Sequence, residues 1–354
     1  MRRGRWHGGS VKAARLYGPR KIRIDEVPKP TPGPGEALVR VEAVGICGSD
    51  LHYFKEGRIG ETAISEPLVL GHEAAGVVEE VGEGVEGLRP GDKVAVDPAV
   101  PCGKCEWCMR GDPNLCPEVR FFGTPPTDGA LREYLAHPAE ALFKLPEGLT
   151  YEDGAMLEPL GVALHAVDLA HLRPGQTVAV FGVGTIGLLV VQLVRLCGAS
   201  WTTATDLLTS RLEMAGSFGA DELVKADEED PVRRIKEATG GRGVDVAFEA
   251  AWVHGTTEQA VEALTPGGTL VLIGIPLGED VISFRASSSR RKGLTIKMVR
   301  RTKHAYPRAV SMTNKGLLDI RSPVTHRFPL EEVERAFEVA SGYGDDVVKV
   351  MVEL

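Results

Sequence analysis

The run Val178–Gly187 constrains the fold of this 354-residue chain more than any other segment. A short apolar stretch leads into a Gly-x-Gly-x-x-Gly pattern, and an apolar helical stretch follows it. In a strand-turn-helix unit, Gly182 makes the tight turn, Gly184 lets the backbone approach a pyrophosphate, and Gly187 lets the helix pack on the strand. The helix N-terminus then offers its N–H groups to the phosphates. The segment therefore predicts a dinucleotide-binding α/β domain.

An acidic residue is expected about 20 positions beyond such a glycine pattern, at the end of the second strand. Asp206 stands there, and its carboxylate could accept hydrogen bonds from the adenosine ribose while repelling a 2′-phosphate. This favours NAD over NADP. Asp206 could instead cap the next helix. Arg211, one turn into that helix, could reach the adenosine or be a solvated surface arginine.

A second constraint comes from four cysteines in the pattern C-x2-C-x2-C-x7-C. Four thiolates this close in sequence suit a tetrahedral structural zinc, which leaves no coordination position for a substrate. Two disulfides fit poorly, because the remaining cysteines, Cys47 and Cys197, lie far apart; Cys197 is interpreted as helix packing. The four predicted ligands are Cys102, Cys105, Cys108 and Cys116.

The composition excludes several classes of protein. With 49 acidic and 41 basic residues the net charge is −8, which argues against nucleic acid as a partner and against a nucleic-acid-binding zinc module. No apolar run reaches the roughly 18–20 residues that span a bilayer. The basic, glycine-rich residues 1–10 resemble no secretion signal and are expected to form a disordered extension. These features predict a cytoplasmic protein that binds no membrane.

The hydrophobic pattern divides the chain into two folded parts. Residues 11–164 carry short alternating runs between Gly and Pro turns, typical of a barrel-like β domain, with the cysteine lobe at about 98–118. Residues 165–298 alternate strands with helices, which predicts a doubly wound parallel sheet. Residues 299–354 return to mixed structure. We therefore expect a β-rich domain built from both ends of the chain, with the α/β domain inserted.

A further group of metal-ligating residues lies in the β-rich part. A catalytic zinc needs about three protein ligands and an open position. Cys47 and His72 are the natural pair, and either Glu73 or Glu158 could be the third ligand. Taken alone, one cysteine and one histidine are more often core residues, so this hypothesis depends on the surrounding motifs.

Together these motifs resemble the zinc-dependent medium-chain alcohol dehydrogenases from Val11 onward, and among them the sorbitol and xylitol (polyol) dehydrogenases of the L-iditol 2-dehydrogenase type. The residues that carry the resemblance are Gly45-Ile-Cys47-Gly-Ser49-Asp50-Leu-His52-Tyr53, Gly57-Arg58-Ile-Gly60, Leu70-Gly-His72-Glu73, Gly123-Thr-Pro-Pro-Thr-Asp-Gly129, Glu158-Pro159-Leu160 and Val324-Thr-His-Arg-Phe-Pro329.

The resemblance implies a GroES-like catalytic domain, a Rossmann domain, and zinc-assisted oxidation of a secondary alcohol to a ketone with hydride transfer to NAD. It implies two zinc ions per chain, one structural and one catalytic, and a proton path from Ser49 through the nicotinamide ribose to His52. Homodimers or homotetramers are common in the family, and the stretch 268–275 is a candidate edge strand for pairing. Further cofactor contacts are implied for Thr185, Ile186, Ile273 and Gly274.

The resemblance also places Tyr53, Phe122 and Arg301 near the polyol pocket. The chain departs from the family pattern after Arg301, where Thr302 replaces an aromatic hydroxyl and Lys303 adds basic character. A polyol is therefore the first expectation for the substrate. A vicinal diol such as 2,3-butanediol and the amino alcohol L-threonine stay open, as does a non-catalytic protein that binds zinc and dinucleotide.

Overall fold

The computed structural model describes residues 9–251, 253, 255–276, 278, 281–342, 344 and 346–354. The chain divides into two compact units. The first, here called the catalytic unit, comprises 1–158, 306–315 and 324–354, and the second, the nucleotide unit, comprises 159–305 and 316–323. Residues 1–8 of the expected N-terminal extension lie outside the described residues, while Ser10 already begins strand β1 (Ser10–Leu16).

The catalytic unit is built on a largely antiparallel sheet in the order β12-β8-β7-β3-β20-β19, with β11 paired to β3 as well. Its strands are β3 (Glu36–Gly45), β7 (Glu73–Val81), β8 (Lys93–Val96), β11 (Tyr134–Pro138), β12 (Leu142–Lys144), β19 (Val324–Pro329) and β20 (Lys349–Glu353). The chain's last strand thus pairs with an early one, which joins the two ends of the sequence in one sheet.

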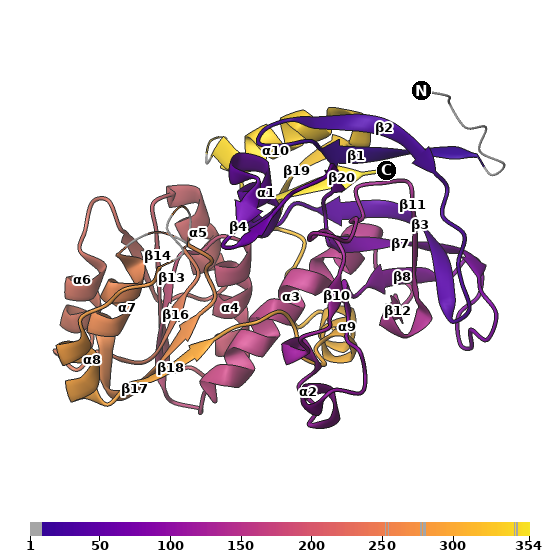
Figure 1. The fold of residues 1–354 in the computed structure, drawn as a ribbon. Coiled ribbons are helices and arrows are strands. Elements are labelled where there is room, and N and C mark those ends of the chain that lie inside the picture. Colours follow the sequence, from indigo (N-terminus) through magenta and orange to yellow (C-terminus); the bar gives the residue numbers. More distant parts are fainter. Residues whose placement is uncertain are drawn as a thin grey trace. The chain divides into compact units, whose positions relative to one another are not determined.

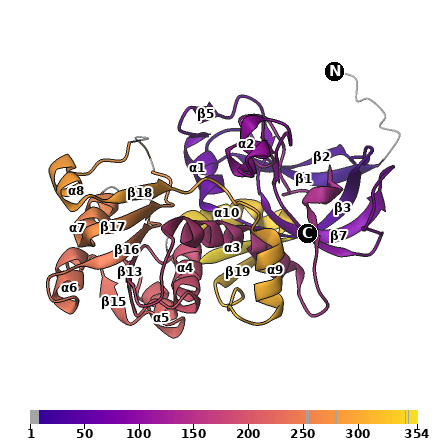
Figure 2. The ribbon, with the colours of Figure 1, turned by 90° about the horizontal axis from the view of Figure 1, so that it is seen from below.

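Smaller elements surround this sheet. Helix α1 (Gly48–Glu56) lies beside α10 (Val333–Gly342) (Figure 2). The two helices pack through Phe54 and Phe337, whose ring centroids are 5.0 Å apart. The other elements of the unit are β2 (Ile22–Pro28), β4 (Arg58–Ile59), β5 (Thr62–Ala63), β6 (Leu68–Val69), β9 (Ala99–Val100), α2 (Glu106–Met109), η1 (Pro113–Leu115), β10 (Arg120–Phe121), η2 (Ala139–Ala141), α9 (Tyr306–Asn314) and η3 (Leu330–Glu332).

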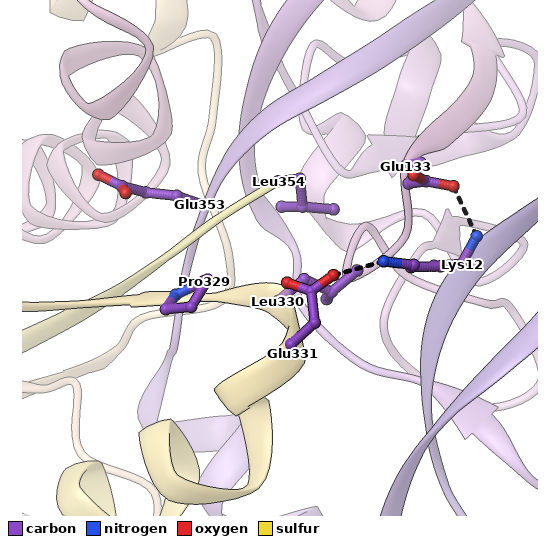
Figure 3. A pocket seen from close by; sticks show the side chains of 7 residues that line it. All are labelled: Lys12, Glu133, Pro329, Leu330, Glu331, Glu353 and Leu354. Carbon is purple, nitrogen blue, oxygen red and sulfur yellow. Dashed lines mark hydrogen bonds and ion pairs between the residues drawn. The ribbon is translucent and has the colours of Figure 1, made fainter.

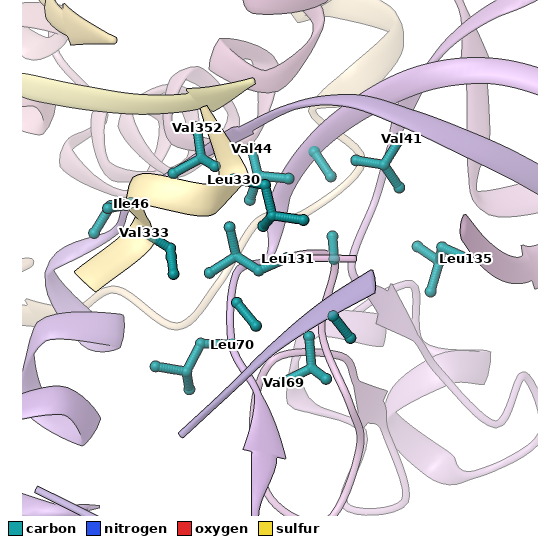
Figure 4. Packing of buried hydrophobic residues seen from close by; sticks show 14 of the residues in the cluster. Val41, Val44, Ile46, Val69, Leu70, Leu131, Leu135, Leu330, Val333 and Val352 are labelled. Carbon is teal, nitrogen blue, oxygen red and sulfur yellow. The ribbon is translucent and has the colours of Figure 1, made fainter. Parts of the chain in front are cut away.

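Alternating apolar residues of these strands fill one core (Figure 4). Val44 from β3, Leu131 from the loop before β11 and Val352 from β20 are each fully buried and belong to the same cluster. Leu330 and Val333 close this core from the C-terminal segment. Burial of apolar surface stabilises this core by roughly 25 cal/mol per Å². The ends of β3 and β7 are therefore held by a rigid sheet.

The nucleotide unit contains a parallel sheet in the order β15-β14-β13-β16-β17-β18. This is the doubly wound order of a dinucleotide-binding fold, with α6 and α7 on one face and α4 on the other (Figure 1). Its strands are β13 (Thr177–Phe181), β14 (Trp201–Asp206), β15 (Glu222–Lys225), β16 (Val244–Glu249), β17 (Leu264–Leu272) and β18 (Thr295–Met298). Its helices are α4 (Thr185–Leu196), α5 (Thr209–Ser217), α6 (Pro231–Ala238), α7 (Thr256–Ala263) and α8 (Ala286–Lys292).

The predicted fold class, a β domain interrupted by a doubly wound sheet, is confirmed. Two details differ from the sequence expectations. Helix α3 (Tyr151–Ala170) carries the chain from one unit into the other, and the boundary between Glu158 and Pro159 lies inside it. The apolar residues of this helix are spread around its circumference, so its sequence gives no clear signal of a boundary. The stretch 268–275 is not an edge strand, since β17 is paired on both sides and β18 forms that edge.

Helices long and apolar enough to cross a bilayer do not occur in the part of the chain that the structure describes.

Two leucines of α4 test the packing of the nucleotide unit. Leu189 is 0% exposed, whereas Leu196 at the end of the same helix is 50% exposed. We expect Leu189→Ala to lower the free energy of unfolding by about 2–5 kcal/mol, because it leaves a cavity. Leu196→Ala should stay within about 0.5 kcal/mol. Urea unfolding followed by circular dichroism measures both, and equal effects would contradict the packing described.

Candidate functional site

The catalytic unit brings three potential metal ligands together where two strands meet. Strand β3 ends at Gly45, shortly before Cys47, and β7 begins at Glu73, directly after His72. Gly45 and Glu73 face one another in the antiparallel β3–β7 ladder. As a result, one ligand atom each from Cys47, His72 and Glu73 lies within 4.8 Å of the other two. A thiolate, an imidazole and a carboxylate are a donor set that zinc accepts, so the geometry fits a metal.

The Asp50 carboxylate holds the loops that carry these ligands. It is 1% exposed, and it accepts hydrogen bonds from the backbone N–H of Cys47 at 3.0 Å and of Gly71 at 3.2 Å. Its Oδ1 also lies 3.4 Å from Nδ1 of His72. A carboxylate beside one ring nitrogen orients a histidine so that the other nitrogen can bind a metal. Asp50 is thus a positioning residue, and sequence reasoning assigned it no role.

Charge and packing prepare the His72 ring for this task. Burial alone would lower the pKa of His72, but the Asp50 carboxylate and the Cys47 sulfur together raise it well above its ordinary value. Metal binding at the ring must therefore displace a proton. The ring of Phe121, in β10, lies 5.4 Å from the His72 ring at an angle of 54°. Phe121 supplies an apolar wall beside the ligand cluster.

Two buried glutamates belong to the same region and differ in their surroundings. Glu73 is 1% exposed and forms an ion pair with Lys349, whose Nζ lies 2.7 and 2.8 Å from its two oxygens. Glu158, in α3, is 5% exposed and lies outside the group of ligand atoms that meet within 4.8 Å. Burial raises the pKa of Glu158 to about 8, with His72 opposing this rise and Glu73 adding to it. The geometry therefore favours Glu73 as the third direct ligand.

The two residues of the expected proton path lie on α1, next to the ligand cluster. Ser49 is half-buried in the first turn of the helix, and His52 follows one turn later. The His52 side chain is only 2% exposed, so a proton that reaches it needs a further carrier or a local opening to arrive in solvent. Their role in proton transfer stays a prediction.

The expected substrate residues are distributed between the two units. Tyr53 is 2% exposed, and burial raises its pKa to about 12, while a hydrogen bond with Thr124 opposes that rise. Phe122 is 3% exposed and packs edge-on against His137, with ring centroids 5.2 Å apart. The ring beside His72 is that of its neighbour Phe121. Arg301 belongs to the nucleotide unit, in a turn where it adopts a φ of 58°.

The four-cysteine lobe assembles a second potential metal site in the catalytic unit. The sulfur atoms lie within 4.8 Å of one another. A tetrahedral site with Zn–S bonds of about 2.3 Å has sulfur atoms about 3.8 Å apart, so the cluster fits a zinc ion closely. The 3.5 Å separation of the Cys105 and Cys108 sulfurs and the 3.4 Å approach of the Cys102 N–H to the Cys116 sulfur agree with this.

In the nucleotide unit, the glycine turn leaves space for a dinucleotide. A Cβ at Gly182 would come within 2.6 Å of the Ala251 Cα, and one at Gly187 within 2.0 Å of the Gly182 carbonyl oxygen. Both glycines are therefore required by the fold. At Gly184 the first atom a Cβ would meet is the Arg211 Nη1, 3.6 Å away. No packing reason requires a glycine there, which fits the expected approach of a pyrophosphate.

Backbone hydrogen bonds fix the Asp206 carboxylate at the end of β14. It accepts from the N–H of Val183 at 2.9 Å, Leu207 at 2.8 Å and Leu208 at 3.0 Å. The alternative that Asp206 caps the next helix is wrong, because the N-cap residue of α5 is Leu208 and the Leu207 and Leu208 donors precede the helix. The bonds to this turn and to Val183 hold the carboxylate oxygens in place as acceptors. Thr185 and Ile186 open α4 beside this carboxylate's partner Val183.

The remaining cofactor candidates, Ile273 and Gly274, follow β17. Their N–H groups donate to the Glu249 carbonyl at 2.9 and 3.1 Å, so they lie at the carboxyl edge of the parallel sheet. A small pocket at this edge is lined by Glu249, Thr257 and Gly274, among others. Ligands of doubly wound sheets bind at this edge.

The catalytic unit also has a polar surface pocket lined by Lys12, Glu133, Glu331 and Glu353, among others (Figure 3). Lys12 pairs there with Glu331 at 2.5 Å. None of the residues proposed from the sequence for metal, cofactor or substrate lines this pocket.

Sequence reasoning named the ligands but missed the residues around them. Asp50 lies within the quoted Gly45–Tyr53 motif and could have been found from its spacing, because it stands three residues after Cys47. Lys349 is 276 residues from Glu73 in sequence, and only the pairing of β20 with β3 brings it there. Phe121, whose ring lies beside His72, was not named by sequence reasoning, and the expected substrate contact of Phe122 stays a prediction.

Comparison with known proteins gives the same picture over nearly the whole chain. Residues 33–147 match the family model of the alcohol dehydrogenase GroES-like domain, and residues 185–315 match that of the zinc-binding dehydrogenases. The sorbitol dehydrogenase of Bacillus subtilis is 38% identical, covering 97% of both chains. That of Bos taurus is 40% identical over 96% of this chain and 94% of its own. The L-idonate 5-dehydrogenase of Vitis vinifera is 37% identical over 99% and 97%.

Solved structures are equally similar. A zinc-binding dehydrogenase of Sinorhizobium meliloti, bound to NADP, has a TM-score of 0.89 and 33% identity over 98% of this chain and 99% of its own. An alcohol dehydrogenase of Escherichia coli, in complex with NADH, has a TM-score of 0.88 and 31% identity over 98% and 100%. The 2R,3R-butanediol dehydrogenase of Bacillus subtilis has a TM-score of 0.87 and 34% identity over 98% and 100%.

The cysteine lobe can be tested by counting metal ions. We expect the purified chain to hold two zinc ions and Cys105→Ser to hold one, because three sulfurs no longer complete the tetrahedron. Cys197→Ser is the matched control, since Cys197 is exposed and lies outside both clusters. Elemental analysis after dialysis against a weak chelator gives the counts. Equal zinc content in the two variants would contradict the assignment of the lobe.

Asp206 can be tested by its effect on the choice of cofactor. Asp206→Asn removes the negative charge and keeps one of the two side-chain oxygens that accept backbone bonds. Because a charge-assisted hydrogen bond contributes about 1.5–3 kcal/mol, we expect the ratio of NADPH to NADH dissociation constants to fall about 10- to 150-fold. Fluorescence titration with each cofactor measures this ratio. An unchanged ratio would leave Asp206 with the backbone-capping role alone.

Proposed function

This chain belongs to the zinc-binding, medium-chain alcohol dehydrogenase family, and we propose that it oxidises a polyol to the corresponding ketose while reducing NAD. The observation that carries the proposal is the meeting of Cys47, His72 and Glu73 within 4.8 Å at the junction of β3 and β7. The similarity to sorbitol dehydrogenases over nearly the full length supports the class of substrate.

The chain's own residues would prepare the alcohol for hydride loss. Cys47, His72 and Glu73 would hold a zinc ion, which supplies Lewis-acid polarisation of the alcohol oxygen. Glu158 is a further buried acid of this region, and its pKa of about 8 keeps most of it protonated near neutral pH. Ser49 would accept the alcohol proton and pass it through the ribose hydroxyl to His52, because an imidazole is the side chain best suited to transfer protons near neutral pH.

The nucleotide unit would bind the second substrate. The N-terminus of α4 and the open space at Gly184 suit the pyrophosphate, and the fixed Asp206 carboxylate suits the ribose hydroxyls. One similar structure holds NADP and another NADH, so the fold alone does not select between them. The negative charge of Asp206 favours NAD, because it would repel a 2′-phosphate.

The residues expected at the substrate suit an extended, hydroxylated molecule. In the catalytic unit, the Phe121 ring lies beside His72, and Tyr53 supplies a buried hydroxyl. In the nucleotide unit, Arg301 carries a guanidinium, a group that can donate several hydrogen bonds to hydroxyls. A vicinal diol is the second candidate, favoured by the similarity to 2R,3R-butanediol dehydrogenase at 34% identity.

We further propose a homo-oligomeric, cytoplasmic enzyme, for which analytical ultracentrifugation and cell fractionation are the direct measurements.

The substrate class is tested by following NADH absorbance with sorbitol, xylitol, 2,3-butanediol and L-threonine. We expect kcat/KM to be highest for one of the two polyols. Turnover of butanediol or threonine alone would overturn the polyol proposal and leave the reaction type standing. Zinc-loaded protein that turns over none of the four would contradict the proposed function.

Glu158 is tested with the isosteric Glu158→Gln. Residues around a metal contribute about 10- to 100-fold to activity, so we expect kcat/KM to fall by that factor. Glu147→Gln, an exposed position of the same unit, serves as the control. A Glu158→Gln enzyme with full zinc content and full turnover would remove Glu158 from the mechanism.

A further inference from the structure

Strand β16 of the nucleotide unit ends in a buried carboxylate, that of Glu249. Glu249 is the last residue of the strand and is 4% exposed. Its Oε1 accepts a hydrogen bond from the backbone N–H of Ala251 at 3.0 Å and another from the Thr256 hydroxyl at 2.8 Å. Hydrogen bonds donated to a carboxylate favour its charged form. The carboxyl edge of the parallel sheet thus carries a negative charge in a fixed position.

The backbone of Glu249 ties this carboxylate to the glycine turn. In the parallel sheet Glu249 pairs with Phe181 of β13 and with Leu272 of β17. The turn that follows β16 packs on the glycine turn, since a Cβ at Gly182 would come within 2.6 Å of the Ala251 Cα. A dinucleotide bound at the glycine turn therefore meets the Glu249 carboxylate in a defined place.

The order of the strands indicates which half of the cofactor lies near this carboxylate. A dinucleotide binds across the carboxyl edge of a doubly wound sheet, with its pyrophosphate at the first glycine turn. Here that turn follows β13, and the adenosine half is expected over β14, which ends at Asp206. Strand β16 lies on the other side of β13, and β17 comes next. The nicotinamide half is thus expected over β16 and β17, where Glu249, Gly274 and Ile282 are among the residues that line a pocket.

The nicotinamide is the part of the cofactor whose charge changes in the reaction. The ring of NAD⁺ carries one positive charge, which it loses on accepting hydride, while the pyrophosphate and both riboses keep their charges. A fixed negative charge near the ring therefore attracts the oxidised form and not the reduced form. At an effective dielectric constant of about 20, two unit charges roughly 10 Å apart change an affinity on the order of tenfold.

We propose that the Glu249 carboxylate selects the redox state of the cofactor, by strengthening the binding of NAD⁺ relative to that of NADH. This inference rests on the proposed function and adds a residue to it. Asp206 acts at the adenosine end, on the choice between NAD and NADP. Glu249 acts at the nicotinamide end, on the choice between the oxidised and the reduced form. Since alcohol oxidation consumes NAD⁺ and releases NADH, this charge favours the oxidising direction.

The test is the ratio of the NAD⁺ to the NADH dissociation constant, measured by isothermal titration calorimetry on the zinc-loaded enzyme. Glu249→Gln removes the charge and keeps an oxygen to accept from Ala251 and Thr256. We expect this ratio to rise about tenfold, because only NAD⁺ loses an attraction. ADP-ribose lacks the nicotinamide and should bind no more weakly than it does to the wild-type enzyme. An unchanged ratio, or equal weakening of all three ligands, would overturn the inference.

Two further variants separate the charge from the hydrogen bonds. Glu249→Asp keeps the charge on a shorter side chain, and its ratio should stay within about threefold of wild type. If the hydrogen bonds of Oε1 were the whole role of Glu249, the Asp variant would shift the ratio and the Gln variant would not. Glu262→Gln is the matched control, because Glu262 is 38% exposed and lies at the opposite end of α7 from Thr256. Its ratio should equal that of the wild type.

Val281→Lys keeps the test decisive if Glu249→Gln does not fold. Val281 lines the same pocket and is 58% exposed, so a lysine there is tolerated and places a positive charge near the Glu249 carboxylate. The ratio should then rise at least about threefold, and an unchanged ratio would overturn the inference. A wild-type enzyme that binds none of NAD⁺, NADH and ADP-ribose would instead contradict the proposed function itself.

Discussion

The buried carboxylate of Asp50 is the constraint on which the rest of the catalytic unit's site depends. Its oxygens accept the N–H groups of Cys47 and Gly71 and lie beside the His72 ring. It therefore fixes two loops that are separated by more than 20 residues and belong to different strands. A carboxylate this deeply buried is stable because each oxygen has a donor, and removing those donors would cost about 1–3 kcal/mol per unsatisfied group.

Around this anchor the chain concentrates negative charge where a cation is expected. Glu73 and Glu158 are buried acids of this region and Asp97 is a partly exposed one, and burial raises the pKa of Glu158 to about 8 and that of Asp97 to about 6. Buried charges persist only when they are paired or bind metals. Lys349 offsets one of them, and the remainder explains why the site suits a divalent ion. Metal affinity and local stability therefore depend on the same buried charges.

Much of this could be predicted from the sequence, and the limits have physical reasons. The glycine turn at Gly182–Gly187, the four-cysteine lobe and the interrupted β domain follow from local spacing, and the fold class is confirmed. The roles of several other site residues, including His52 and Arg301, stay predictions. Lys349 could not be found, because its role depends on a pairing between strands from opposite ends of the chain. The contact of Phe121 with His72 could not be found either, because it brings together residues that are far apart in the sequence.

The order of the elements along the chain has a consequence for how the protein is made. The nucleotide unit draws most of its residues from one continuous stretch, so it can fold on the ribosome as soon as that stretch has emerged. The catalytic sheet must wait for Lys349–Glu353, which are synthesised after the whole of the nucleotide unit. Cys47, His72 and Glu73 therefore remain without the lysine that pairs with Glu73 while the nucleotide unit is being made. The newborn chain completes this ligand cluster only after the residues of its dinucleotide-binding fold have been synthesised.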